Sequence, residues 1–245
     1  MKKHIRRIIL KIYLLLKERK FRKRLKYIYI NNHSDSLLVV FSGFPSGKPV
    51  YNYMRTLSNL KTISKLFILD DFGYKGSYYW FEKGKDYPLS LTTDLIKTVM
   101  GGGKFKRMVT MGTSKGGTCA IYYGLIFKAS DIYSGACQYY VGNYLSIKEH
   151  LPILKAMLGE NYSEEDVYQL NQMMPNILKV SEGQQSVVHL LYSKNEHTYQ
   201  DHIVYLIDDL NKYHIPYTEQ VENFNEHVAV GNFFIDYIKK EFKYE

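Results

Sequence analysis

Three residue types are scarce in this chain, which has two cysteines, six prolines and one tryptophan among 245 residues. Cys119 and Cys137 cannot build a disulfide framework, so we expect a reducing compartment, the cytoplasm. The apolar run from Ile8 to Leu16 contains Lys11 and is far shorter than the roughly 20 residues that cross a bilayer. A composition of 45% apolar and 23% charged residues predicts a globular protein of one domain.

Motifs for metals and nucleotide phosphates are also missing. The sequence has no H-E-x-x-H pair and no cluster of cysteine and histidine. The glycine run at 101–103, followed by Lys104, lacks the spacing of a phosphate-binding loop and is typical of a helix stop. We therefore expect neither a metal nor a bound cofactor.

The positive charge is confined to one end of the chain. Residues 1–26 carry a net charge of +11, whereas the rest carries −2. The apolar residues between Ile5 and Leu16 share one face at helical spacing, which predicts a basic amphipathic arm over 1–30. Anionic lipid, an anionic polymer or a partner protein would each suit this arm. We expect peripheral contact with the inner membrane or an assembly machinery through residues 1–26, and no nucleic-acid partner.

Residues 31–245 are expected to form a single catalytic domain. Short apolar runs alternate with helical patterns, which predicts a mostly parallel, doubly wound α/β sheet. The pattern is interrupted at about 138–185 by short helical pieces, which we interpret as a cap over the site. We expect strands at 37–41, 66–69, 107–111, 132–133, 187–192 and 217–221, and helices at 50–64, 90–100, 117–127, 198–213 and 228–242.

The most informative motif is Gly112-Thr113-Ser114-Lys115-Gly116, between a predicted strand and a predicted helix. G-x-S-x-G in this context is the nucleophile elbow of α/β-hydrolases. The strained turn lifts the serine hydroxyl clear of the sheet and directs helix N-terminal N–H groups toward a developing oxyanion. Ser114 is therefore the candidate nucleophile, with the backbone of Lys115 and of Gly43 or Phe44 as candidate oxyanion hole.

A serine nucleophile needs a base and an acid that orients the base. In α/β-hydrolases these follow the nucleophile along the chain, on loops after later strands. Glu196 follows the strand at 187–192, and His227 follows the last strand. Asp201 is the rival acid, although it falls within the next predicted helix.

Other side chains are weaker candidates for substrate contact. Asp70 and Asp71 end a strand, where they could cap a turn or bind a hydroxyl. Tyr78 and Trp80 lie in an aromatic stretch that suits either a sugar-stacking platform or core packing. His197 adjoins the acid and could contact substrate.

Four segments occur in a fixed order along the chain: FSGFP (41–45), LDDFGYKGSYYW (69–80), MGTSKGGTCAIYYGL (111–125) and YSKNEHTY (192–199). Together they resemble bacterial capsule-biosynthesis proteins of the XcbB/CpsF type, and among them the serine-dependent O-acetyltransferases of meningococcal capsule. The resemblance covers roughly 37–240.

This resemblance implies an α/β-hydrolase-like fold with Ser114, Glu196 and His227 as the triad. It also implies acetyl transfer from acetyl-CoA to a hydroxyl of an anionic capsular polysaccharide, a polymer of N-acetylmannosamine phosphate. Without the resemblance, the residues indicate only acyl transfer or hydrolysis by a serine nucleophile. An esterase acting on carbohydrate and a non-catalytic scaffold for capsule assembly are the alternatives.

Overall fold

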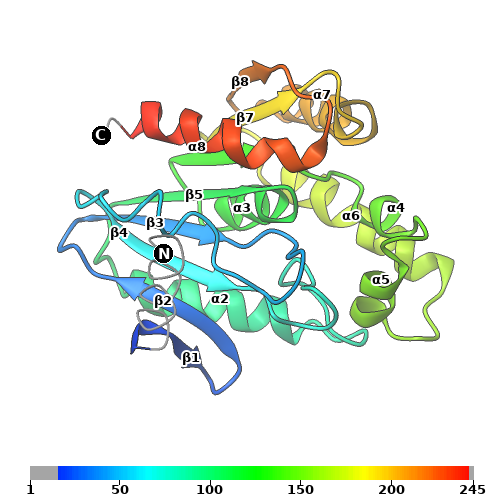
Figure 1. The fold of residues 1–245 in the computed structure, drawn as a ribbon, viewed down its shortest axis with the longest axis horizontal. Helices are drawn as coiled ribbons and strands as arrows, with labels where there is room; N and C mark the ends of the chain where they lie inside the picture. Colours follow the sequence, from blue (N-terminus) through cyan, green and yellow to red (C-terminus); the bar gives the residue numbers. More distant parts are fainter. Residues whose placement is uncertain (1–15, 243–245) are drawn as a thin grey trace, which may run out of the picture.

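A computed structural model describes residues 16–242 and is built around one eight-stranded sheet (Figure 1). The strand order is β1-β2-β4-β3-β5-β6-β7-β8, and every neighbouring pair from β4 to β8 is parallel. The pairs β1–β2 and β2–β4 are antiparallel. The strands are β1 (Arg19–Phe21), β2 (Leu25–Ile30), β3 (Ser36–Phe41), β4 (Ser64–Leu69), β5 (Arg107–Thr113), β6 (Asp131–Gly135), β7 (Val187–Ser193) and β8 (Tyr217–Glu222).

Both faces of the sheet are covered, as the continuous apolar run of β3 predicts. Leu37 and Val39 join a core beneath α2, α3, α6 and α7, whereas Leu38 and Val40 join a second core beneath α8. The predicted α/β-hydrolase-like, mostly parallel, doubly wound fold is thereby confirmed. The helices of these two layers are α2 (Tyr87–Met100), α3 (Lys115–Ile126), α6 (Glu164–Val180), α7 (Val204–Lys212) and α8 (Val230–Glu241).

The regular elements between β6 and β7 are all helices, joined by turns, in the segment where we expected a cap over 138–185. It contains α4 (Val141–Leu145), α5 (Leu151–Leu158) and α6. The last of these begins with a reciprocal cap: Ser163 Oγ accepts from the Asp166 N–H, and Asp166 accepts from the Ser163 N–H. In Figure 1 the three helices lie together at one end of the sheet.

Two segments differ from the sequence-based expectation. Residues 19–30, which we expected in the arm, form β1 and β2 and pair with β4, so the domain begins before residue 31. Alternating β-branched and aromatic residues in 26–30 were the overlooked strand signal.

The predicted helix at 50–64 is a series of turns. Its carbonyls at Leu57 and Leu60 accept from the Lys65 ammonium instead of continuing a helical ladder.

Most of the predicted amphipathic face, Ile5 to Leu15, lies outside the described residues. Across residues 16–242 we find no helix with the length and apolarity needed to cross a bilayer.

Lys65 should make stability depend on pH in the alkaline range. Burial and then the charge of Lys61 lower the pKa of Lys65 to about 8, from an ordinary 10.5. Between these values the folded chain has released a proton that the unfolded chain still holds. Stability contributed by this group therefore rises with pH from about 8 to 10.5. Urea denaturation at pH 7.5 and 10 should show that the free energy of unfolding of wild type rises relative to that of Lys65→Met.

Exposed Lys48 provides the matched control, because Lys48→Met should leave the pH dependence of wild type unchanged. Parallel pH profiles for wild type and Lys65→Met would show that Lys65 titrates normally.

Candidate functional site

Ser114 lies in a sharp turn between β5 and α3. Its backbone φ is +53°, a strained conformation for a residue with a side chain. A Cβ at Gly112 would lie 2.3 Å from the backbone of Gly116, and a Cβ at Gly116 would lie 2.8 Å from the carbonyl oxygen of Phe41. Because these neighbours are backbone atoms, they cannot move aside, and both positions require glycine.

A continuous chain of hydrogen bonds joins Ser114 to His227 and Glu196. The Ser114 Oγ lies 2.8 Å from His227 Nε2, and His227 Nδ1 lies 3.1 Å from Glu196 Oε1. An ionised carboxylate only accepts, so Nδ1 carries the hydrogen and Nε2 is left to accept from the serine hydroxyl. His227 begins the short 3-10 turn η2 (His227–Ala229), and Glu196 follows β7.

Glu196 is held as a buried anion. Its side chain has no exposed surface. Burial acts to raise its pKa, but hydrogen bonds from His227 and Thr198 outweigh burial and leave the pKa below its ordinary value. His197 Nε2 also lies 3.1 Å from Oε1, so two imidazoles share one carboxylate oxygen.

The same three side chains offer donor atoms within 4.8 Å of one another, close enough to hold one metal ion. No sequence motif indicated this set. Glu196, His197 and His227 are already joined by hydrogen bonds, so a metal here would compete with the connection to Ser114.

The rival acid, Asp201, does not contact His227. It is in the π-helical turn η1 (Tyr199–Ile203), 63% exposed, and its nearest imidazole is that of His197 at 3.7 Å.

Sequence reasoning missed Gln138, whose Nε2 donates to Ser114 Oγ over 3.1 Å. It follows β6, and only its position after a strand end hinted at the site.

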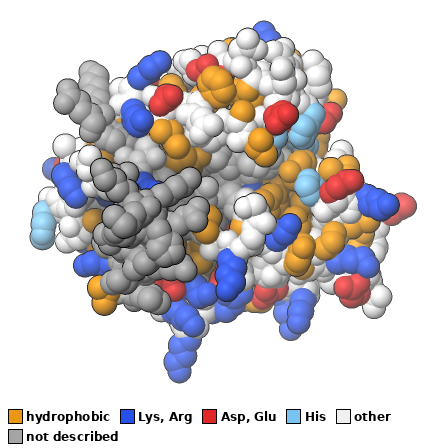
Figure 2. Space-filling model, in the orientation of Figure 1, with side chains coloured by type: hydrophobic (Ala, Val, Ile, Leu, Met, Phe, Trp, Pro, Cys, Tyr) orange, Lys and Arg blue, Asp and Glu red, His pale blue; other side chains and the backbone are white. Residues whose placement is uncertain are grey.

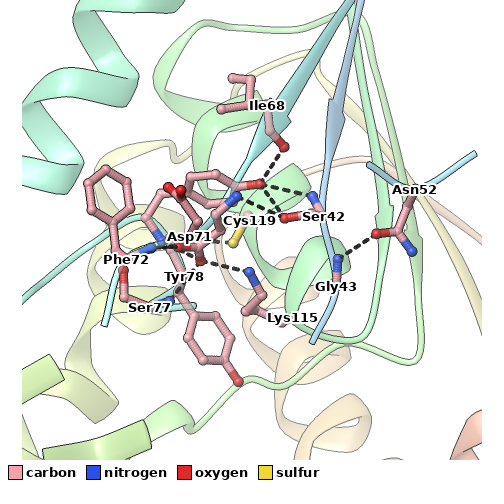
Figure 3. Close-up of polar contacts among 12 residues, drawn as sticks. Ser42, Gly43, Asn52, Ile68, Asp71, Phe72, Ser77, Tyr78, Lys115 and Cys119 are labelled. Atoms are coloured by element: carbon pink, nitrogen blue, oxygen red, sulfur yellow. Dashed lines mark hydrogen bonds and ion pairs between the residues drawn. The ribbon is translucent and has the colours of Figure 1, made fainter. Parts of the chain in front are cut away.

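Two backbone segments border Ser114 where an oxyanion would form. Lys115 is the first residue of α3, so its N–H has no acceptor within the helix. Of the two candidates after β3, the Gly43 N–H already donates to Asn52 Oδ1 over 3.1 Å (Figure 3). This leaves the N–H of Phe44 as the better second donor.

A buried ion pair anchors the residue after the serine. The Lys115 ammonium lies 2.6 Å from Asp70 Oδ2, and neither side chain has exposed surface. The same oxygen accepts from the N–H groups of Ser77 at 2.8 Å and Tyr79 at 3.2 Å. In Figure 3 Lys115 points into this cluster, which also holds the Ser42 hydroxyl.

Four weaker candidates for substrate contact are corrected by their burial or pairing. Tyr78 and Trp80 have no exposed surface and stack on each other in the core, so they cannot form a platform for sugars. Asp70 is occupied by Lys115, and Asp71 by Arg24 and Lys26. His197, 55% exposed, is the one of the five that stays accessible beside the site.

Ser114 and His227 open into a cavity of about 860 Å³. The helical segment after β6 contributes Tyr144 and His150 to its wall, and the turns after β3 contribute Phe44. The face shown in Figure 2 gathers histidine and hydrophobic side chains around a hollow. A volume of this size suits a small-molecule substrate.

Solved structures with the same fold include acyltransferases and hydrolases. A capsule O-acetyltransferase of Neisseria meningitidis serogroup A, in complex with CoA, is 18% identical over 92% of this chain and 94% of its own, with a TM-score of 0.74. The fluorophosphonate-binding serine hydrolase FphF of Staphylococcus aureus, substrate bound, is 16% identical over 89% and 90%, with a TM-score of 0.63. An S-formylglutathione hydrolase from Agrobacterium tumefaciens is 13% identical over 92% of both chains, also at 0.63.

At these identities the likeness establishes the fold. No protein-family model and no curated protein matches the sequence.

The buried ion pair gives a test of stability. Lys115→Met leaves the Asp70 carboxylate buried without its cation, and should lower the free energy of unfolding by about 3–5 kcal/mol. Asp70→Asn should cost a similar amount, and the double variant less than the sum of the two. Urea denaturation measures all three.

The exposed pair of Lys155 and Glu160 is the matched control, and Lys155→Met should cost less than about 1 kcal/mol. If Lys115→Met cost no more than this control, the buried pair would be unimportant to the fold.

Proposed function

We propose that this protein is a serine-dependent O-acetyltransferase that moves acetyl from acetyl-CoA to sugar hydroxyls of an anionic bacterial capsular polysaccharide. The observation that carries the proposal is the hydrogen-bonded series Ser114, His227 and Glu196 on a strained elbow, open to a large cavity. The fold shared with a capsule O-acetyltransferase in complex with CoA supports this donor and acceptor.

In the first half-reaction Ser114 Oγ attacks the thioester carbonyl carbon of acetyl-CoA. His227 Nε2 removes the hydroxyl proton, and Glu196 stabilises the imidazolium that results. The N–H groups of Lys115 and Phe44 stabilise the negative charge on the carbonyl oxygen. The carbon–sulfur bond then breaks, and His227 returns its proton to the thiolate, which gives acetyl-Ser114 and CoA thiol.

In the second half-reaction a sugar hydroxyl replaces the thiol. His227 removes the proton of this hydroxyl as its oxygen attacks the acetyl carbon. The bond to Ser114 Oγ breaks and the proton passes to the serine, so the enzyme is restored. The order of these steps predicts ping-pong kinetics.

The charge of the cavity suits the donor. Arg55 and Lys75 line the same space as Ser114, where they can pair with phosphate groups of CoA. Within residues 16–242 neither side chain forms an ion pair, and together they outnumber Glu149, the acidic residue that lines the same cavity.

The surface charge suits an anionic polymer. The β1–β2 hairpin exposes Arg19, Lys20, Arg22 and Lys23. In Figure 2 Lys and Arg side chains gather along the lower edge, where Figure 1 places these strands. The hairpin would therefore take over part of the role that we assigned to the arm, and residues 1–15 contain five further Lys and Arg residues. Attraction to capsule phosphates or to anionic lipid at the inner membrane face would weaken with salt.

An esterase is the second candidate function, favoured by the hydrolases that share this fold. Water instead of a sugar hydroxyl would then resolve acetyl-Ser114, with the same triad.

The roles of the three residues are tested on the first half-reaction. Ser114→Ala should lower the rate of thiol release from acetyl-CoA by at least about a thousandfold, because it removes the nucleophile. Glu196→Gln should lower this rate by about a hundredfold or more, because the histidine loses its charged partner. Stopped-flow detection of free thiol measures both rates.

Asp201→Asn is the control for the acid, since its carboxylate faces His197 and solvent. Its rate should stay within twofold of wild type. A loss equal to that of Glu196→Gln would transfer the acid role to Asp201.

The fate of the acetyl group separates the two functions. Purified protein is incubated with acetyl-CoA, with and without a de-acetylated N-acetylmannosamine phosphate polymer. We expect polymer to accelerate steady thiol release at least tenfold and an O-acetyl ester to appear on the sugar by NMR. Thiol release that polymer does not change, without any sugar ester, would establish the esterase instead.

A further inference from the structure

A second, smaller pocket lies beside the catalytic cavity. It has a volume of about 390 Å³ and is bordered by α4, η1 and the start of α7. Tyr144 lines both spaces. His197, which contacts the triad carboxylate of Glu196, lines the smaller one. The two spaces therefore adjoin at Tyr144, and a ligand that occupies both has to pass over this side chain.

The lining of the pocket is aromatic and amide-rich. Tyr140 and Tyr205 meet at its edge with ring centroids 5.1 Å apart, and Tyr205 is 46% exposed. Exposed Asn143 and Gln200 add amide donors and acceptors. Aromatic faces with nearby amides suit a sugar ring, because the ring stacks its C–H face while its hydroxyls form hydrogen bonds.

His202 adds a buried hydrogen-bond donor, the N–H of its Nε2 atom. It is 3% exposed, and burial lowers its pKa to about 4, so the ring is neutral at pH 7. Its Nδ1 accepts the backbone N–H of Tyr140 over 3.3 Å, which leaves the hydrogen on Nε2. Among the described residues the pocket is lined by no lysine or arginine, in contrast to the catalytic cavity, and the exposed carboxylate of Asp201 adds a negative charge at its rim, which disfavours an anionic group. The ligand should therefore be uncharged at this point.

We propose that this pocket is a second acceptor subsite, which binds a neutral sugar ring of the polysaccharide next to the residue being acetylated. The inference rests on the proposed function, because it requires a glycan acceptor. It adds that the enzyme prefers oligomeric over single-sugar acceptors, since only an oligomer fills both spaces. Tyr78 and Trp80 are buried, so the aromatic surface that we assign to this subsite is the pair Tyr140 and Tyr205.

Tyr205→Ala tests the subsite with a de-acetylated N-acetylmannosamine phosphate oligomer and with free N-acetylmannosamine. We expect the KM for the oligomer to rise about tenfold, which corresponds to a loss of about 1.4 kcal/mol of binding free energy. The KM for the single sugar and the rate of acetyl-Ser114 formation should not change. Tyr205→Phe, which keeps the ring, should restore the oligomer KM.

Tyr168→Ala is the matched control, because this tyrosine is 54% exposed on α6 and outside both spaces. It should leave every parameter unchanged. Wild type that forms no acetyl-Ser114, or that acetylates neither acceptor, would reject the proposed function and the subsite with it. Wild type that acetylates the oligomer while Tyr205→Ala keeps its KM would reject the subsite alone. A matching loss with the single sugar would indicate structural damage and also overturn it.

Discussion

The close contact between the elbow and the strand beside it is the constraint on which the site depends. Gly116 packs against the carbonyl of Phe41 at a distance that no side chain allows, and Gly112 packs as closely against Gly116. This contact holds Ser114 in its strained conformation at the end of β5 and starts α3 directly behind it. The serine is therefore positioned by backbone geometry, before any interaction with His227 contributes.

The parallel sheet then brings the remaining groups to the same edge. The strands β5, β7 and β8 run in one direction, so the loops that follow them meet at their carboxyl ends. Glu196 and His227 are on two of these loops, which is why His227 contacts Ser114, 113 positions earlier in the chain. The buried carboxylate of Glu196, shared by two imidazoles and the hydroxyl of Thr198, fixes the orientation of the ring.

Sequence reasoning reached this arrangement where the signal was local. The elbow has a defined spacing, and strand-to-loop order predicted the fold and which loops converge. Signals that depend on three-dimensional burial were not readable. The aromatic stretch around Tyr78 and Trp80 has the same composition whether it packs inside or faces a sugar, and only the structure shows that it is inside. The short strand β1 and the turns at 51–63 depend on pairing with β2 and on Lys65, partners that no local pattern reveals. The role of Gln138 beside Ser114 is likewise a product of folding.

The buried polar network around Tyr79 could not be predicted from the sequence, and it connects several segments of the site. Tyr79 joins the turn after β3 to the loop after β4: its hydroxyl accepts the Ser42 N–H, and its own N–H donates to Asp70. The Asp70 carboxylate in turn holds Lys115. Both backbone segments that border the proposed oxyanion position are thus fixed by one buried polar network. Groups that are fixed before the reaction need no reorganisation when negative charge develops, and such electrostatic preorganisation is usually the largest single contribution to catalysis. In the proposed reaction Lys115 therefore acts through its backbone N–H, because its charged side chain is buried against Asp70 and holds that N–H in place.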